Sequence, residues 1–181
     1  MKITLSNILI ALLCAALICA ALLVGAVRGW NGEREEALSA LTEKGEMRTQ
    51  LEERGMDAAN LSVVAARHLS ADNADLLALQ AASRTLLSDT QDIQAILQAD
   101  ATITSVALRF STELPLLPSV QDSSRDQTYI SMLTASLGKK SSLTNSYTQL
   151  VEDYNHRLSS SIMGRLAMLL GVDPLPVPDA E

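Results

Sequence analysis

Near its N-terminus the chain carries an unbroken run of apolar residues. Ile8 to Val27 form twenty consecutive positions without a charged or strongly polar side chain. A helix rises about 1.5 Å per residue, so this run spans roughly 30 Å, the thickness of the hydrocarbon core of a bilayer. Trp30 follows the run, and indoles prefer the headgroup region. The pattern predicts a transmembrane helix over residues 8–27, within an N-terminal membrane anchor of residues 1–30.

A cleaved signal peptide is the alternative interpretation of this segment. Lys2 provides a short basic region, and Val24-Gly25-Ala26 is an acceptable cleavage site. The apolar core of a signal peptide runs about 7–15 residues, and this one is longer, which favours an uncleaved anchor. Positive charges are nearly balanced, with Lys2 before the segment and Arg28 and Arg34 after it. The expected location is the cell membrane, single-pass, with a slight preference for an extracytoplasmic large domain.

The rest of the chain repeats apolar residues at helical spacing and contains few helix breakers. No proline occurs before Pro115 or between Pro118 and Pro174. Because proline breaks helix interiors, long helices fit on both sides of the first pair. Ser70 to Asn73 supply capping side chains and predict a turn. The expected helices cover about residues 33–69, 73–112 and 122 onward.

Apolar residues of the third predicted helix mark the face that it buries. Their spacing alternates between three and four, which is typical of the seam of a coiled-coil-like bundle. No segment of the chain alternates convincingly at the period of two that a strand would show. The stripe contains Ile130, Leu133, Leu137, Lys140, Thr144, Tyr147, Val151, Tyr154 and Leu158.

Together these patterns predict an all-α protein. A single N-terminal transmembrane helix is followed by an antiparallel bundle of three long helices, with a short C-terminal segment, over residues 31–171. Gly45 and Gly55 weaken the first long helix locally, by about 1 kcal/mol each relative to alanine. The Pro-rich C-terminal tail, residues 172–181, is expected to be extended and mobile.

Composition agrees with helices and excludes one class of partner. Hydrophobic residues make up 48% of the chain and aromatic residues only 3%, so most of them are small aliphatic residues. The net charge of −7 is opposite to what phosphate binding requires, so nucleic acid is not an expected partner. Cys14 and Cys19 both lie inside the apolar segment, which argues against a disulfide framework and against a thiolate metal site.

No constellation of catalytic or metal-binding residues is readable. His68 and His156 lie on different predicted helices without partners at ligand spacing. Adjacent acidic residues such as Glu152-Asp153 point about 100° apart on a helix, which suits a solvated face. A phosphate-binding glycine loop, a nucleophile elbow and a Cys–His pair are all missing from the sequence. We expect no catalytic residue, no metal site and no cofactor.

Several short motifs run through the chain in a consistent order. They are Gln50 to Arg54 followed by Asn60-Leu61, Leu114-Pro115, Tyr147-Thr148, Tyr154-Asn155, and Ala167 with Gly171. In order and spacing these motifs resemble the LemA family. The resemblance implies a helical bundle held at a membrane, without established enzymatic activity or cofactor.

The chain also departs from this family. Ala59 stands where the family usually has proline. The family tends to place Gln, Glu and Arg at the positions that are here Ile130, Leu137 and Thr144. These positions are seven apart and share one helix face, so we infer an apolar layer in place of a polar one.

The expected function is an interaction or structural role of a membrane-anchored helical-bundle protein in the bacterial envelope. The expected partners are the lipid bilayer and an envelope protein of unknown identity, and a homo-oligomer is compatible with the pattern. The alternative is a hydrolase or modifying enzyme whose site is assembled from scattered residues such as Arg54, Asn60, Tyr147 and Asn155. The candidate interhelical polar or partner contacts are Arg54, Asn60, Tyr147, Tyr154 and Asn155.

Overall fold

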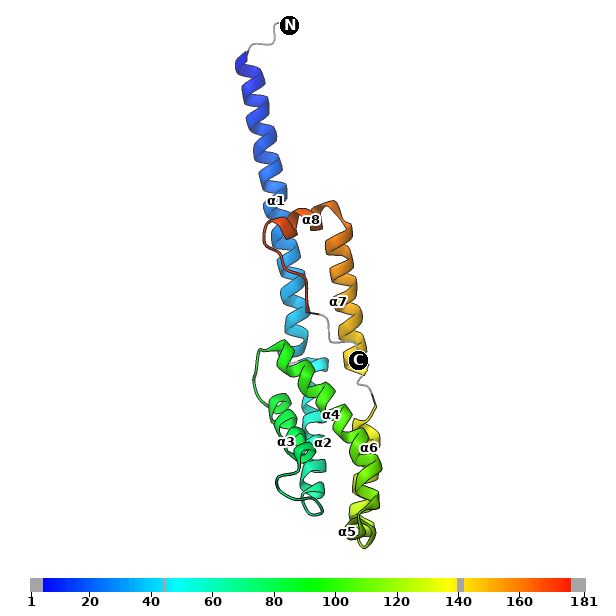
Figure 1. Ribbon diagram of the computed structural model, residues 1–181. Coiled ribbons are helices and arrows are strands. Elements are labelled where there is room, and N and C mark those ends of the chain that lie inside the picture. The colour runs from blue at the N-terminus through cyan, green and yellow to red at the C-terminus, as the bar shows by residue number, and fades with distance from the viewer. Residues whose placement is uncertain (1–4, 44, 140–141, 177–181) are drawn as a thin grey trace. The chain divides into compact units, whose positions relative to one another are not determined.

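The computed structural model describes residues 5–43, 45–139 and 142–176, which form helices joined by turns and loops, with no strand among them (Figure 1). Their contacts divide into two units. Of the described residues, one unit contains 5–37 and 150–176, and the other contains those of Leu38–Gln149. These limits differ from the predicted single bundle over residues 31–171.

The first helix, α1, covers Leu5–Thr42 and includes the predicted anchor. Apolar side chains along its first half are exposed, from Leu9 at 66% to Val24 at 55%. Within the described residues, this is the one helix that is long and apolar enough to cross a membrane. Further along, Ala37 and Leu41 are buried. The helix therefore changes from an apolar surface to a packed one along its length.

The first unit also contains the second part of α7 (Ser142–Ser160) and all of α8 (Ile162–Leu169). On α7, the ring of Tyr154 packs edge-on against Trp30 of α1, with centroids 5.6 Å apart. Nearby, the Arg157 guanidinium lies 2.9 Å from a carboxylate oxygen of Glu33. An aromatic contact and an ion pair are therefore among the contacts that join α1 to α7 in this unit.

A glycine reverses the chain after α8. Gly171 has φ of +95°, a conformation that side-chain-bearing residues rarely adopt. Its N–H donates to the carbonyl of Met168, and the N–H of Val172 donates to that of Ala167, which is the Schellman pattern of a helix C-terminus. Val172 and Leu175 are then buried. Residues 172–176 form neither helix nor strand, and residues 177–181 lie outside the described residues, so the extended and mobile tail stays a prediction.

The second unit is a ring of four packed helices. α2 contacts α3 and α6, and α4 contacts the same two helices, with a short 3₁₀ turn η1 and the short helix α5 between α4 and α6. Buried aliphatic side chains such as Leu61, Leu79 and Ile103 fill the centre. The elements are α2 (Glu46–Ala65), α3 (Ala74–Leu87), α4 (Ile93–Glu113), η1 (Leu114–Leu116), α5 (Pro118–Gln121) and α6 (Ser124–Leu137).

The prediction of three long helices is wrong, because each of them is interrupted. The first is divided near Gly45, which precedes α2 in an extended conformation with φ of −158°. The second is divided between Ser88 and Asp92, where the Asp92 side chain caps α4 by accepting from the N–H of Ala95. The third ends at Leu137 and resumes at Ser142.

The residues of the predicted apolar stripe remain on the buried face despite these interruptions. Lys140 lies outside the described residues, as does the side chain of Thr144. The remaining members are all buried, at 6% exposure or less: Ile130, Leu133, Leu137, Tyr147, Val151, Tyr154 and Leu158. The hydrophobic spacing therefore identified the buried face correctly, although it did not reveal where the helix ends.

Candidate functional site

A groove of about 380 Å³ runs between α2 and α6 on the surface of the four-helix unit. Its walls carry exposed apolar side chains, with Val63 exposed at 60% and Met132 at 57%. Tyr129 on α6 is also exposed. The lining residues are Asp57, Asn60, Val63, Val64 and Arg67 from α2 and the residues just after it, and Arg125, Tyr129, Met132 and Leu133 from α6.

The two helices that form the groove run antiparallel. At one end Arg67, just after α2, binds Asp126 in the first turn of α6, with 2.9 Å between nitrogen and oxygen. Toward the other end Arg54 on α2 reaches the carbonyl of Leu137, the last residue of α6. The groove therefore runs from the C-terminal end of α2 to a point within one turn of Arg54.

The charges of the groove are separated along its length. Arg67 and Arg125 lie at the end near Asp126, while Asp57 lies at the end near Arg54. The guanidinium of Arg125 sits 5.7 Å from the centroid of the Tyr129 ring. Neither Arg125 nor Asp57 forms an ion pair with another described residue. Arg67 is paired with Asp126, so Arg125 is the cation at this basic end of the groove without an ion pair to a described residue; the middle is apolar, and Asp57 forms the acidic end.

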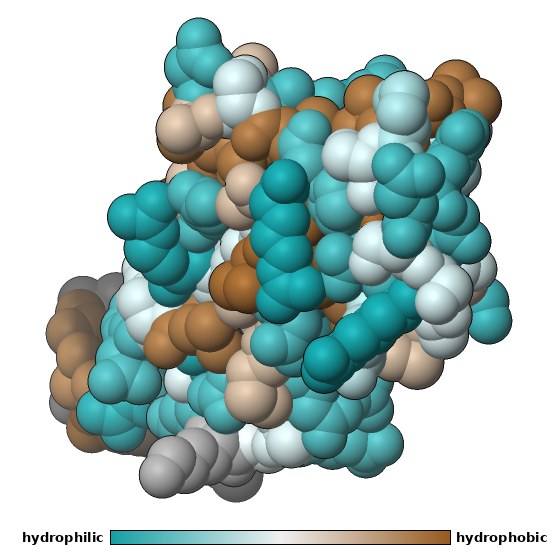
Figure 2. Space-filling view, turned by 90° about the horizontal axis from the view of Figure 1, so that it is seen from below, coloured by the Kyte–Doolittle hydropathy of each residue, from teal (hydrophilic) through white to brown (hydrophobic). Residues whose placement is uncertain are grey.

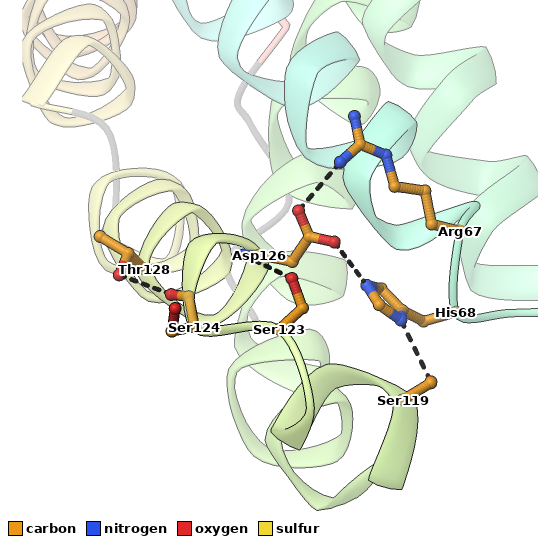
Figure 3. Close-up of polar contacts among 7 residues, drawn as sticks. All are labelled: Arg67, His68, Ser119, Ser123, Ser124, Asp126 and Thr128. Atoms are coloured by element: carbon orange, nitrogen blue, oxygen red, sulfur yellow. Dashed lines mark hydrogen bonds and ion pairs between the residues drawn. The ribbon is translucent and has the colours of Figure 1, made fainter.

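A cluster of polar side chains adjoins the basic end (Figure 3). One carboxylate oxygen of Asp126 accepts from Arg67, and the other lies 3.1 Å from Nε2 of His68. The second ring nitrogen of His68, Nδ1, lies 3.1 Å from the hydroxyl of Ser119 on α5. Ser123 caps α6 by accepting from the N–H of Asp126. The cluster ties the turn after α2 to both α5 and α6.

The hydrogen bonds connect Ser119, His68 and Asp126 in the sequence hydroxyl, imidazole, carboxylate, which is also the sequence found in a catalytic triad. If Nε2 of His68 donates to Asp126, Nδ1 accepts the proton of the Ser119 hydroxyl, an assignment that follows from the network. Asp126 is shared with Arg67, however, and neither of the two grooves described here is lined by Ser119 or His68. Because the three side chains join the turn after α2 to α5 and α6, we interpret the cluster as a clasp between these elements.

Asp75 and Asp126 are among the carboxylates of the four-helix unit whose pKa lies below the ordinary aspartate value. Burial opposes ionisation of Asp126, but the hydrogen bond from His68 and the charge of Arg67 outweigh it and lower its pKa. The pKa of Asp75 is lowered chiefly by hydrogen bonds from Arg109, whose two nitrogens lie 2.6 and 2.9 Å from its oxygens. Both groups therefore bind protons less readily in the folded state than in the unfolded state.

The four-helix unit is expected to lose stability in acid. A carboxylate whose pKa is lower when folded stabilises the fold above its unfolded pKa, and that contribution is lost as the pH falls through the folded value. The loss is therefore expected below about pH 4. The urea midpoint should fall between pH 5 and pH 2, and less steeply in the double variant Asp75→Asn, Asp126→Asn. Exposed Asp89→Asn serves as the control; equal slopes in all three proteins would contradict the expectation.

A second groove, of about 590 Å³, lies between α4, α5 and α6. Lys139 is the one charged residue in its lining, which is otherwise formed by apolar and small polar side chains such as Leu108, Pro115 and Ser131. Viewed from below, the surface carries hydrophobic residues in small patches that hydrophilic residues separate (Figure 2). The second groove therefore lacks the opposite charges that lie at the two ends of the α2–α6 groove.

The five residues singled out from the sequence are placed differently by the structure. Arg54 is a half-buried interhelical contact: its Nε lies 2.7 Å from Asp100 and its Nη2 lies 2.9 Å from the Thr104 hydroxyl. Asn60, six residues further along α2, is exposed and lines the α2–α6 groove. The structure therefore does not bring the side chains of Arg54 and Asn60 to a common surface.

The other three candidate residues, Tyr147, Tyr154 and Asn155, lie on α7 and are buried or half-buried. Tyr147 is fully buried. The Tyr154 hydroxyl donates to the backbone carbonyl of Trp30 at 3.3 Å. Asn155 binds the extended segment after α8, donating to the carbonyl of Leu175 at 3.0 Å and accepting from its N–H at 2.8 Å. Tyr154 and Asn155 therefore act as interhelical and tail-holding contacts.

Sequence reasoning missed the contacts of Arg48 on α2 and of Arg67 and His68 just after it. Arg48 is buried and donates to the carbonyls of Leu86 and Ser88 at the end of α3, at 3.0 and 2.7 Å. Arg67 and His68 both contact Asp126, which is 58 or more residues away in the sequence. Such contacts have no short-range spacing to signal them. The only local sign was that Arg67 and His68 follow a long apolar pattern at a predicted helix end.

No family model, no curated protein and no solved structure matches this chain. The resemblance to the LemA family therefore rests on the sequence motifs alone and stays a prediction.

Proposed function

We propose that this chain is a membrane-tethered helical-bundle protein of the bacterial envelope that binds a polypeptide partner in the α2–α6 groove. One observation carries the proposal: the two features occur in one chain. The first half of α1 exposes apolar side chains, and the four-helix unit has a surface groove with apolar walls and charges at its two ends. The proposal agrees with what the resemblance to the LemA family implies.

Exposure of the first half of α1 supports the tether. Leu9, Leu12, Leu17 and Leu22 are each exposed by 57% or more, and no other part of the described chain covers them. Burial of a leucine side chain is worth roughly 1.5–3 kcal/mol, so a row of them in water is strongly unfavourable. A bilayer removes this penalty along the whole segment. We place the four-helix unit on the extracytoplasmic side, following the slight preference of the charge balance.

The α2–α6 groove supports a binding role. Val63, Tyr129 and Met132 are exposed although they are large and apolar, and together they line one surface feature. Exposed apolar side chains that gather beside polar ones are typical of protein interaction sites. Arg125 and Asp57 are free to pair with charges of a partner, as no described residue forms an ion pair with either.

The full-length protein is expected to remain in the membrane pellet after alkaline carbonate washing. Twenty apolar residues gain several kcal/mol on insertion even on the modest scale measured at the translocon. The mature N-terminus should be read by mass spectrometry on the same sample. Release into the supernatant, or a mature chain that begins at Val27, would replace the tether with a cleaved signal peptide.

A further inference from the structure

The α2–α6 groove has a length and a shape that suit one kind of occupant. Its α2 wall runs from Asp57 to Arg67, which is about 15 Å at a rise of 1.5 Å per residue. Two antiparallel helices form its sides, and no strand with a free edge exists among the described residues. A third helix packs into such a groove by placing apolar residues at every third or fourth position. The groove therefore accommodates about three turns of helix.

The charges of the groove select among possible helices. The chain has a net charge of −7, yet Arg67 and Arg125 stand together at one end of this groove. An entirely acidic partner is repelled by most of the chain, and an entirely basic partner is repelled by these two arginines. A partner with carboxylates at one end only meets the arginines, and cationic residues at its other end meet Asp57.

Helix electrostatics then sets the direction of the occupant. Acidic side chains stabilise the first turn of a helix, and basic side chains stabilise the last turn. A helix with this natural charge order places its N-terminal turn at Arg67 and Arg125 and its C-terminal turn at Asp57. Since α6 begins at the arginine end, such an occupant runs parallel to α6 and antiparallel to α2.

We infer that the partner is an amphipathic helix that places acidic residues of its first turn against Arg125, beside the Arg67–Asp126 pair, and lays its apolar face over Val63 and Met132. This inference rests on the proposed function, and it adds the class of the partner, its charge order and its direction.

Two designed peptides test the inference directly. Both are fluorescein-labelled helices of fourteen residues with the same apolar stripe; one has Glu in its first turn and Lys in its last, and the other has these charges exchanged. Fluorescence anisotropy with the full chain in detergent micelles measures each dissociation constant. The first peptide is expected to bind about tenfold more tightly, because two partly exposed charge contacts change sign between the peptides.

Matched variants separate the groove from the rest of the surface. Arg125→Glu is expected to remove or invert the preference, and it should fold normally because Arg125 is exposed and forms no ion pair with a described residue. Arg84→Glu makes the same change on α3, outside the groove lining, and should leave the preference intact. Val63→Arg obstructs the apolar wall and should weaken both peptides by more than tenfold.

The outcomes distinguish failure of the inferred charge order and direction from failure of the proposed binding function of the groove. Equal affinity for both peptides, abolished by Val63→Arg, would retain the groove as a binding site and overturn the charge order and direction. Binding that Val63→Arg does not change would overturn both. Self-association of the chain that Arg125→Glu disrupts, without peptide binding, would overturn the inference in favour of a second copy as the occupant.

Discussion

Replacing Arg54 with methionine is expected to lower the free energy of unfolding of the four-helix unit by about 3–5 kcal/mol, the range for breaking a buried ion pair. The Arg54 side chain is 14% exposed and the Asp100 side chain 5%. The guanidinium binds Asp100 and Thr104 on α4 and the carbonyl of Leu137 on α6. Methionine fills much of the space but leaves the buried carboxylate without its cation.

Urea unfolding of the full chain in detergent micelles, followed by proteolysis of the unfolded fraction, measures this change. The double variant Arg54→Met, Asp100→Leu should recover most of the lost stability, because removing both charges also removes their desolvation cost. Arg84→Met, at an exposed position on α3, should shift stability by less than about 0.5 kcal/mol. An Arg54→Met protein as stable as Arg84→Met would show that the pair is not buried as described.

Replacing Leu137 with glutamate is expected to destabilise the same unit by more than about 2 kcal/mol. Leu137 is fully buried at the end of α6, so the substitution trades a buried apolar side chain for a carboxylate. The cations on the neighbouring helices are already engaged: Arg109 binds Asp75, Arg84 donates to its own helix, and Arg54 binds Asp100. For any of them, pairing with the new carboxylate would break an existing contact.

Leu137→Met is the matched control, and it should cost less than about 1.5 kcal/mol because it nearly preserves volume and polarity. The same urea and proteolysis measurement compares the two variants. A glutamate variant with the stability of the methionine variant would place position 137 at the surface. The inferred apolar layer would then fail as well; its members Ile130 and Leu137 are buried, and the side chain of Thr144 lies outside the described residues.

Hydrophobic spacing was sufficient to predict the helical class and the buried faces. The alternation of three and four identified Ile130, Leu133, Tyr147 and Tyr154 as buried, and all four are. It could not place the helix ends, because the heptad register continues across the interruption between Leu137 and Ser142. Local signals marked the other interruptions: Gly45 before α2, and the capping side chain of Asp92 before α4. These short-range signals outweighed the longer apolar pattern.

The candidate site was predictable only in part. Asn60 was singled out from the sequence and lines the groove, but Arg67 and Arg125 were not. Arg54 was singled out as a candidate for an interhelical or a partner contact, but its partner Asp100, 46 residues away, was not. Pairings of this kind depend on how α2 is placed against α4 and α6. No periodic feature of a single helix encodes that placement.

Site-specific photocrosslinking in intact cells tests the central claim most directly. A photoreactive amino acid is placed in the full chain at Val63 or Met132 in the groove, and at exposed Ala81 on α3 as the control. We expect a discrete polypeptide adduct in the membrane fraction from both groove positions, absent at Ala81 and lost when Arg125→Glu is added. No adduct at either groove position, or equal adducts at all three, would contradict a membrane-tethered protein that binds its partner between α2 and α6.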